Sequence, residues 1–101
     1  MFAKKLSFML NNNEYFEGKV KSIGFTSHRG PATVGVLEPG EYEFGTSTIE
    51  YMTVVSGKMT VLLPDENEWT EYGPFETFII GKNKKFKVKN EVACAYLCDY
   101  R

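Results

Sequence analysis

The chain has 101 residues, a length that fits one domain. Its composition, 43% hydrophobic and 15% aromatic, is ample for a packed core and excludes a disordered chain. Twelve basic and thirteen acidic residues give a formal net charge of -1, which supplies no overall positive field for holding nucleic acid. No uncharged apolar stretch approaches the ~18 residues that a membrane span needs, and the N-terminus lacks the pattern of an export signal. We therefore expect a cytoplasmic protein that binds neither nucleic acid nor membrane.

Short runs of alternating apolar and polar residues, separated by Gly, Pro, Asn and Asp, extend along the chain and predict an all-β fold. Residues 1–9 are expected to form an N-terminal extension, followed by one domain at residues 10–101. The pattern predicts nine short strands: Gly18 to Phe25, Thr33 to Leu37, Glu41 to Phe44, Ile49 to Val55, Lys58 to Leu63, Glu68 to Tyr72, Thr77 to Ile80, Lys85 to Val88 and Val92 to Tyr100. Such strands with glycine turns are typical of a single jelly-roll β-barrel.

Basic residues lie in and after the first predicted strand. Lys19 and Lys21 share one strand face, so they are either solvated lysines on an exposed edge or charges that point into a polar cavity. His28 is the single histidine of the chain, which leaves too few histidines for a histidine-based metal site, and we expect a solvated loop residue. Its neighbour Arg29 is either a surface group or a guanidinium fork that meets phosphate oxygens at a barrel mouth.

The predicted strand from Ile49 to Val55 carries the sharpest functional candidate, Glu50. Glu50 shares a strand face with Met52 and Val54, because successive side chains point to opposite faces, so its carboxylate would enter an apolar interior. Burying an unpartnered carboxylate costs on the order of several kcal/mol, which makes Glu50 a candidate for function. The alternative is that this face meets solvent and Tyr51 points inward. Hydroxyls from nearby residues would complete a metal-free polar pocket, namely those of Tyr42, Thr46 and Thr48.

The C-terminal part of the chain adds a basic run and two cysteines. The run from Lys82 to Lys89 contains a single aromatic residue, Phe86, so we interpret it as an edge strand protected by lysines rather than as a nucleic-acid site. Cys94 and Cys98 stand about 13 Å apart on an extended strand, too far for a disulfide, and are expected to be half-buried thiols. Strands that are apolar on both faces predict a homodimer formed through sheet packing.

Three segments carry a family resemblance: NEYFEGKVKSIGF, VGVLEPGEYEFGTSTIEYMTVVSGKMTVLLPDENEW and YLCDY. From about Leu10 to Tyr100 the chain resembles the small cupin family of pyrimidine/purine nucleoside phosphorylases. That family is similar to metal-binding cupins in fold but lacks their histidines; here Phe44, Thr46 and Thr48 stand where such barrels carry a His-x-His pair. The resemblance implies phosphorolysis of purine and pyrimidine nucleosides to a free base and a pentose 1-phosphate, with no metal or cofactor and with inorganic phosphate as co-substrate.

Such a reaction passes through an oxocarbenium-like state, so it benefits from a carboxylate near the sugar and from donors around phosphate. Glu50 is the expected catalytic residue, which would hold ribose hydroxyls or support the developing positive charge. The expected substrate-binding residues are Arg29, Lys19, Lys21, Thr46 and Thr48 for phosphate, and Tyr42, Phe86 and Tyr96 for stacking on the base. Two alternatives remain: a non-catalytic cupin that binds a small molecule, and a metal-dependent dioxygenase or isomerase.

Overall fold

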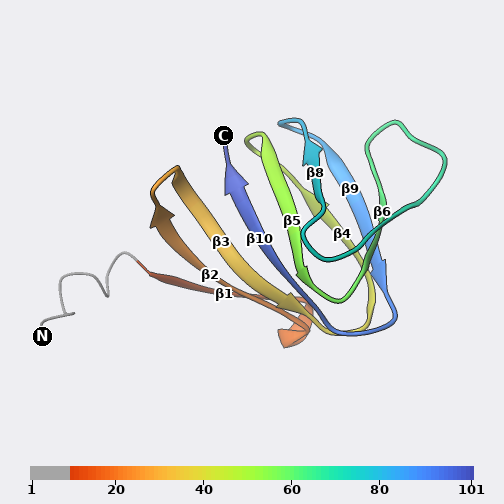
Figure 1. The fold of residues 1–101 in the computed structure, drawn as a ribbon, viewed down its shortest axis with the longest axis horizontal. Coiled ribbons are helices and arrows are strands. Elements are labelled where there is room, and N and C mark those ends of the chain that lie inside the picture. The colour runs from red at the N-terminus through yellow and green to blue at the C-terminus, as the bar shows by residue number, and fades with distance from the viewer. Residues whose placement is uncertain (1–9) are drawn as a thin grey trace, which may run out of the picture.

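A computed structural model describes residues 10–101, which form ten β-strands and one 3-10 turn (Figure 1). The elements are β1 (Asn11–Tyr15), η1 (Phe16–Gly18), β2 (Val20–Ser27), β3 (Gly30–Leu37), β4 (Gly40–Gly45), β5 (Glu50–Ser56), β6 (Met59–Leu62), β7 (Thr70–Tyr72), β8 (Thr77–Ile80), β9 (Lys85–Asn90) and β10 (Cys94–Tyr100). The predicted all-β fold is confirmed, and the nine expected strands correspond to β2 through β10. The expected N-terminal extension, residues 1–9, lies outside the described residues.

The additional strand is β1, whose sequence NNNEY gave no strand pattern because asparagine is depleted in strands. It forms through antiparallel pairing with β2, in which Asn11 lies opposite Gly24 and Tyr15 opposite Val20. Pairing with a neighbour thus overrides a weak local preference. Within the described part of the chain, no helix is long and apolar enough to cross a membrane.

Two antiparallel sheets make up the jelly roll (Figure 1). One sheet has the order β1-β2-β3-β10-β5-β8 and the other the order β4-β9-β6-β7. The two sheets stay separate, so the arrangement is an open, cupin-like sandwich rather than the closed barrel that we expected. β1 and β4 are each an edge strand of one sheet, and residues of both line the cavity described below.

The core lies between the sheets and follows from strand alternation, which sends every second side chain to the inner face. Burying a large apolar side chain contributes roughly 1.5–3 kcal/mol, so this interior is the main source of stability. The fully buried residues come from both sheets: Val20, Leu37, Val54, Met59, Val61, Ile80, Val88, Cys94 and Cys98.

The Lys82–Lys89 run is not the edge strand that we expected. Strand β9 lies between β4 and β6 in the middle of the four-stranded sheet. Its lysines alternate with buried residues and point outward, where Lys87 lies opposite Glu43 and Lys89 opposite Glu41. Oppositely charged cross-strand neighbours stabilise such a face, so acidic residues of β4 rather than an exposed edge accommodate the lysines.

Both cysteines of β10 are free thiols, and both are 1% exposed rather than half-buried. Strand β10 lies between β3 and β5, so its inward-facing side chains meet the core and not the rim. The thiol of Cys94 donates a hydrogen bond of 2.6 Å to the carbonyl oxygen of Lys58. The thiol of Cys98 instead faces the acidic group of Glu50.

Candidate functional site

A cavity of about 370 Å³ lies between the two sheets, and we call it the inter-sheet cavity. Its volume falls within the range of roughly 300–1,000 Å³ that is typical of small-molecule sites. Apolar residues of both sheets form its interior: Leu37, Met52, Met59 and Phe86. Exposed residues mark the entrance at the free edges, namely Tyr15, Phe16, Glu43 and Gly45. The cavity is therefore open to solvent on one side of the sandwich.

Glu50, the first residue of β5, lines this cavity. The predicted strand face is confirmed, because Met52 and Val54 on the same face are 5% and 0% exposed. The Glu50 carboxyl is half-buried and accepts a hydrogen bond of 3.6 Å from the thiol of Cys98. Burial raises the pKa of Glu50 above its ordinary value, and the thiol hydrogen bond offsets part of that rise. A thiol is a weak donor, so this carboxyl retains capacity for a ligand.

Three hydroxyl groups face the same cavity, those of Ser22, Tyr96 and Tyr100. Burial raises the pKa of Tyr96 to about 12, with a smaller opposing effect from Ser22, and burial also raises the pKa of Tyr100. Both phenols therefore stay protonated at neutral pH and can donate hydrogen bonds. Tyr100 already shares a hydrogen bond of 2.9 Å with Thr33.

Gly35, on the neighbouring strand β3, leaves room for the Tyr96 ring because it has no side chain. A Cβ atom at Gly35 would lie 2.5 Å from the Tyr96 ring, so the ring occupies the space that any other residue would fill. Sequence reasoning selected Tyr96 but missed Cys98 and Tyr100. Strand alternation could have indicated both, because every second residue of a strand lies on the same face, which places Cys98 and Tyr100 beside Tyr96.

Aromatic rings form one wall of the inter-sheet cavity. The Phe44 ring lies 5.6 Å from Phe86 and 5.6 Å from Phe16, measured between ring centroids. The predicted stacking residue Phe86 therefore lines the cavity, and so does Tyr96. Tyr42 lies behind this wall, 5.0 Å from Phe16, and its hydroxyl donates a hydrogen bond of 2.7 Å to the carbonyl oxygen of Glu38.

Two predicted hydroxyl residues, Thr46 and Thr48, are absent from the cavity lining. Their prediction depended on closeness to Glu50 in the sequence, but β4 ends at Gly45 and both residues lie in the loop that follows it. The Thr46 hydroxyl donates a hydrogen bond of 2.6 Å to the carbonyl oxygen of Gly81 and accepts one from the amide of Lys84, which ties this loop to the turn before β9. The Thr48 hydroxyl is buried, and no other residue of the described chain forms a hydrogen bond with it.

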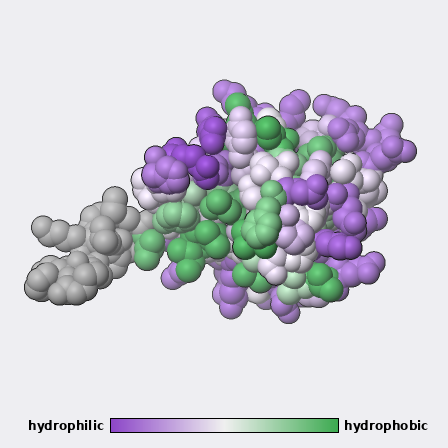
Figure 2. Space-filling model, in the orientation of Figure 1, coloured by the Kyte–Doolittle hydropathy of each residue, from purple (hydrophilic) through white to green (hydrophobic). Residues whose placement is uncertain are grey.

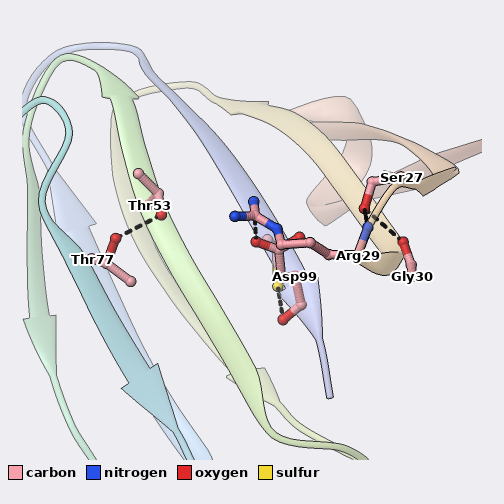
Figure 3. A network of polar contacts seen from close by, with 7 residues as sticks. Ser27, Arg29, Gly30, Thr53, Thr77 and Asp99 are labelled. Carbon is pink, nitrogen blue, oxygen red and sulfur yellow. Dashed lines mark hydrogen bonds and ion pairs between the residues drawn. The ribbon is translucent and has the colours of Figure 1, made fainter.

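The predicted phosphate-binding cations also lie outside the cavity lining. Arg29 reaches from the β2–β3 turn across the outer face of the six-stranded sheet, where its Nη2 lies 3.0 Å from Oδ2 of Asp99 (Figure 3). Lys21 is exposed and lies 3.4 Å from Glu14, while Lys19 is exposed just before β2 begins. No lysine or arginine of residues 10–101 lines the cavity, whose charged residues are Glu43 and Glu50.

The prediction for His28 and for metal ligands bears on the same site. His28 is exposed in the β2–β3 turn, as expected for a solvated loop residue. In the part of the chain that the structure covers, no group of three or more His, Cys, Asp or Glu residues is placed to hold a metal ion. The side chains that line the cavity supply two carboxyl groups, those of Glu43 and Glu50, together with a thiol, hydroxyls and aromatic rings.

Comparisons with known proteins identify relatives over almost the whole chain. The model of a family described as pyrimidine/purine nucleoside phosphorylase matches residues 10–100. Proteins of that name from Marinobacter nauticus and Pseudomonas aeruginosa are 54% and 53% identical, over 91% and 92% of this chain and 99% and 100% of theirs. A Vibrio parahaemolyticus crystal structure, described as of unknown function, has a TM-score of 0.88 at 44% identity, covering 91% of this chain and 98% of that one. A cupin superfamily protein from Desulfitobacterium hafniense has a TM-score of 0.65 at 11% identity, covering 92% and 84%, which shows the fold alone.

Proposed function

The chain belongs to the pyrimidine/purine nucleoside phosphorylase family, and we propose that it is a pentosyltransferase that splits purine and pyrimidine nucleosides with inorganic phosphate. The products would be a free base and a pentose 1-phosphate. The observation that carries the proposal is the carboxyl group of Glu50 inside a cavity walled by aromatic rings. The names of relatives at 53% and 54% identity support the same reaction.

In this reaction a phosphate oxygen forms a bond to C1′ of the pentose while the C1′–N bond to the base breaks. The base leaves with the electron pair of that bond and takes up a proton, which dihydrogen phosphate can supply. Positive charge develops on the sugar ring in between, and a nearby carboxylate stabilises it. We assign this role to Glu50, with its ionised form as the active one.

Phosphate binding is the demanding step, because no cationic side chain of residues 10–101 lines the cavity. The hydroxyls of Ser22, Tyr96 and Tyr100 are neutral donors that can meet phosphate oxygens. The Arg29 guanidinium could take part only if it left Asp99, on the opposite face of the sheet. We therefore favour the hydroxyls, and the earlier prediction for Arg29 stands as the alternative.

Assembly and location complete the proposal. The outer face of the six-stranded sheet exposes Ile23, Val34 and Val36, which are 46–48% exposed, and Figure 2 shows apolar side chains gathered on this face. An exposed apolar sheet face of this kind is suited to packing against another sheet, and we propose that two copies of the chain form a homodimer through it. The two free thiols are compatible with a reducing compartment, and we place the reaction in the cytoplasm.

The direct test is to incubate purified protein with inosine, adenosine and uridine, with and without phosphate, and to measure free base. We expect base release that depends on phosphate. No such release from any of the three nucleosides would reject the phosphorylase. A cavity that receives no lysine or arginine from the described residues also suits a second candidate, a binding protein without catalysis. Tight nucleoside binding without turnover in the same preparation would favour that candidate.

A further inference from the structure

We propose that Phe16, in the turn between β1 and β2, is the residue that stacks on the base of the nucleoside at the cavity entrance. The inference deepens the proposed function, since it takes a nucleoside as the ligand of the inter-sheet cavity. It differs from the expectation that Tyr42, Phe86 or Tyr96 fills this role. The backbone of the turn, the exposure of the aromatic rings and the position of Phe16 in the cavity lining support it.

The backbone at Phe16 is in an unusual conformation. Phe16, Glu17 and Gly18 have φ values of +53°, +58° and +84°, three left-handed residues in succession. Glycine adopts this region freely, but for phenylalanine and glutamate it costs free energy because Cβ approaches the backbone. Strain of this kind persists where the surrounding structure or a function requires a side chain in one position. In this turn, the strained backbone places the Phe16 ring at the cavity entrance.

Exposure separates Phe16 from the other aromatic residues. Tyr42, Phe86 and Tyr96 are 4%, 3% and 9% exposed, so protein atoms already cover their rings. Phe16 is 43% exposed and lines the cavity, so part of its ring is free to meet a ligand. A planar base stacks only on a ring that has a free face.

Orientation separates Phe16 from Tyr15, which also lines the entrance and is 50% exposed. The edge-on contact with Phe44, at 86° between ring planes, and the contact with Tyr42 fix the Phe16 ring from two sides. Among the described residues, Tyr15 has no comparable ring contact. A preorganised ring loses less conformational entropy when it binds, which favours Phe16 as the stacking surface.

Stacking on a ring without polar groups also explains how one site accepts two classes of base. Purines and pyrimidines differ in the hydrogen-bonding groups at their edges, but both present a π-face. A base held against Phe16 at the entrance directs its pentose inward, toward the hydroxyls and the carboxyl of Glu50 that line the interior. Base tolerance and sugar recognition are then separate properties of the entrance and the interior.

Calorimetric titration with inosine, uridine and free ribose tests the inference on wild type, Phe16→Ala and Phe75→Ala. Phe75 is a matched control, because it also has a positive φ, of +70°, is 81% exposed and is absent from the cavity lining. We expect Phe16→Ala to weaken binding of both nucleosides roughly tenfold, as the loss of one stacking contact predicts, and to leave ribose binding within about twofold. Phe75→Ala should change none of the three affinities.

A second variant, Phe16→Gly, guards against a folding defect, since glycine accepts the φ of +53° and removes the ring as well. The thermal midpoint of each variant is measured beside its affinities. Nucleoside affinity unchanged in both Phe16 variants would overturn the inference, and so would an equal loss for ribose, or a wild-type protein that binds neither nucleoside.

Phosphorolysis is measured on the same proteins so that the two proposals can fail separately. If the reaction proceeds and Phe16→Ala leaves KM for nucleoside unchanged, the stacking inference is wrong and the phosphorylase stands. If no reaction occurs but nucleoside binding falls as expected in the Phe16 variants, the stacking site stands and the phosphorylase is wrong. For an active enzyme we expect KM to rise roughly tenfold and kcat to change less.

Discussion

The two faces of the six-stranded sheet each carry a carboxyl group shielded from water, and the partners of the two groups differ. On the outer face, Asp99 is 6% exposed and forms an ion pair of 3.0 Å with Arg29. On the inner face, Glu50 is half-buried and accepts a hydrogen bond of 3.6 Å from the thiol of Cys98. These two residues lie on the adjacent strands β10 and β5. A guanidinium compensates the charge of Asp99, whereas a weak donor leaves that of Glu50 largely uncompensated.

The difference separates a structural carboxyl group from one available for chemistry. Ion pairing satisfies Asp99 within the protein, so a ligand that bound it would have to displace Arg29. Burial raises the pKa of Glu50 because the ionised carboxylate loses contact with water. A ligand that brings positive charge or hydroxyl donors would stabilise the ionised form in place of that water. The sheet thus carries an ion-paired, structural carboxylate on its outer face and, on its inner face, a carboxyl group that can still bind a ligand.

The largest expected effect follows from removing the inner charge. Glu50→Gln keeps the shape of the side chain but cannot carry a negative charge, so we expect kcat for phosphorolysis to fall on the order of 100-fold or more. Initial rates with inosine and uridine at saturating phosphate measure it. The matched control is Asp99→Asn, the same change on the outer face, which should keep kcat within a few-fold of wild type. Equal losses in both variants would remove the distinction between the two faces.

The second effect concerns assembly on the outer face. Val34→Asp places a charge among the exposed apolar residues of β2 and β3, and we expect it to convert a homodimer into monomers because a charge is costly in an apolar interface. Sedimentation equilibrium at micromolar concentration measures the mass. Val92→Asp is the control, since Val92 is 54% exposed, against 46% for Val34, but lies outside the sheet. A wild-type protein that sediments as a monomer would contradict the proposed dimer.

The third effect is on stability. Arg29→Ala leaves Asp99 buried without its partner, and we expect the free energy of unfolding to fall by about 1–3 kcal/mol, below the cost for a fully buried pair because the Arg29 side chain is 47% exposed. Urea denaturation measures the change. Lys21→Ala breaks the exposed pair with Glu14 and should cost about 0.5 kcal/mol or less. Similar losses for Arg29→Ala and Lys21→Ala would show that the burial of Asp99 adds nothing.

Alternation within one strand was the part of this site that sequence could supply. It placed Glu50, Met52 and Val54 on one face, and the structure agrees, because that pattern depends only on backbone geometry. Thr46 and Thr48 were predicted from their closeness to Glu50 in the sequence alone, and they lie outside the cavity lining, in the loop after β4. A pattern of side chains therefore predicts a face only within the bounds of its strand.

Contacts between residues far apart in the chain could not be predicted from the sequence pattern. Arg29 and Asp99 are 70 residues apart, and nothing local to either indicates that their strands are neighbours. The lysines of β9 are typical of a protected edge strand, and only the pairing with β4 places Glu41 and Glu43 opposite them. The sequence also gave no sign of the left-handed backbone at Phe16, since a phenylalanine rarely adopts that conformation. These features depend on topology, which one sequence does not determine by pattern alone.

The smallest expected effect is the pH dependence of stability that Glu50 imposes. Burial raises its pKa in the folded state, so the folded protein holds the proton more tightly than the unfolded chain does. Below the ordinary glutamate pKa both states are protonated and burial of the acid costs little. As the pH rises through the raised pKa, the folded state must carry a buried charge, and stability falls. Thermal unfolding of wild type and Glu50→Gln from pH 4 to pH 8 should show equal midpoints at the acidic end and a higher midpoint for the variant at the alkaline end. A constant difference across the range would mean that the carboxyl of Glu50 titrates like a solvated one.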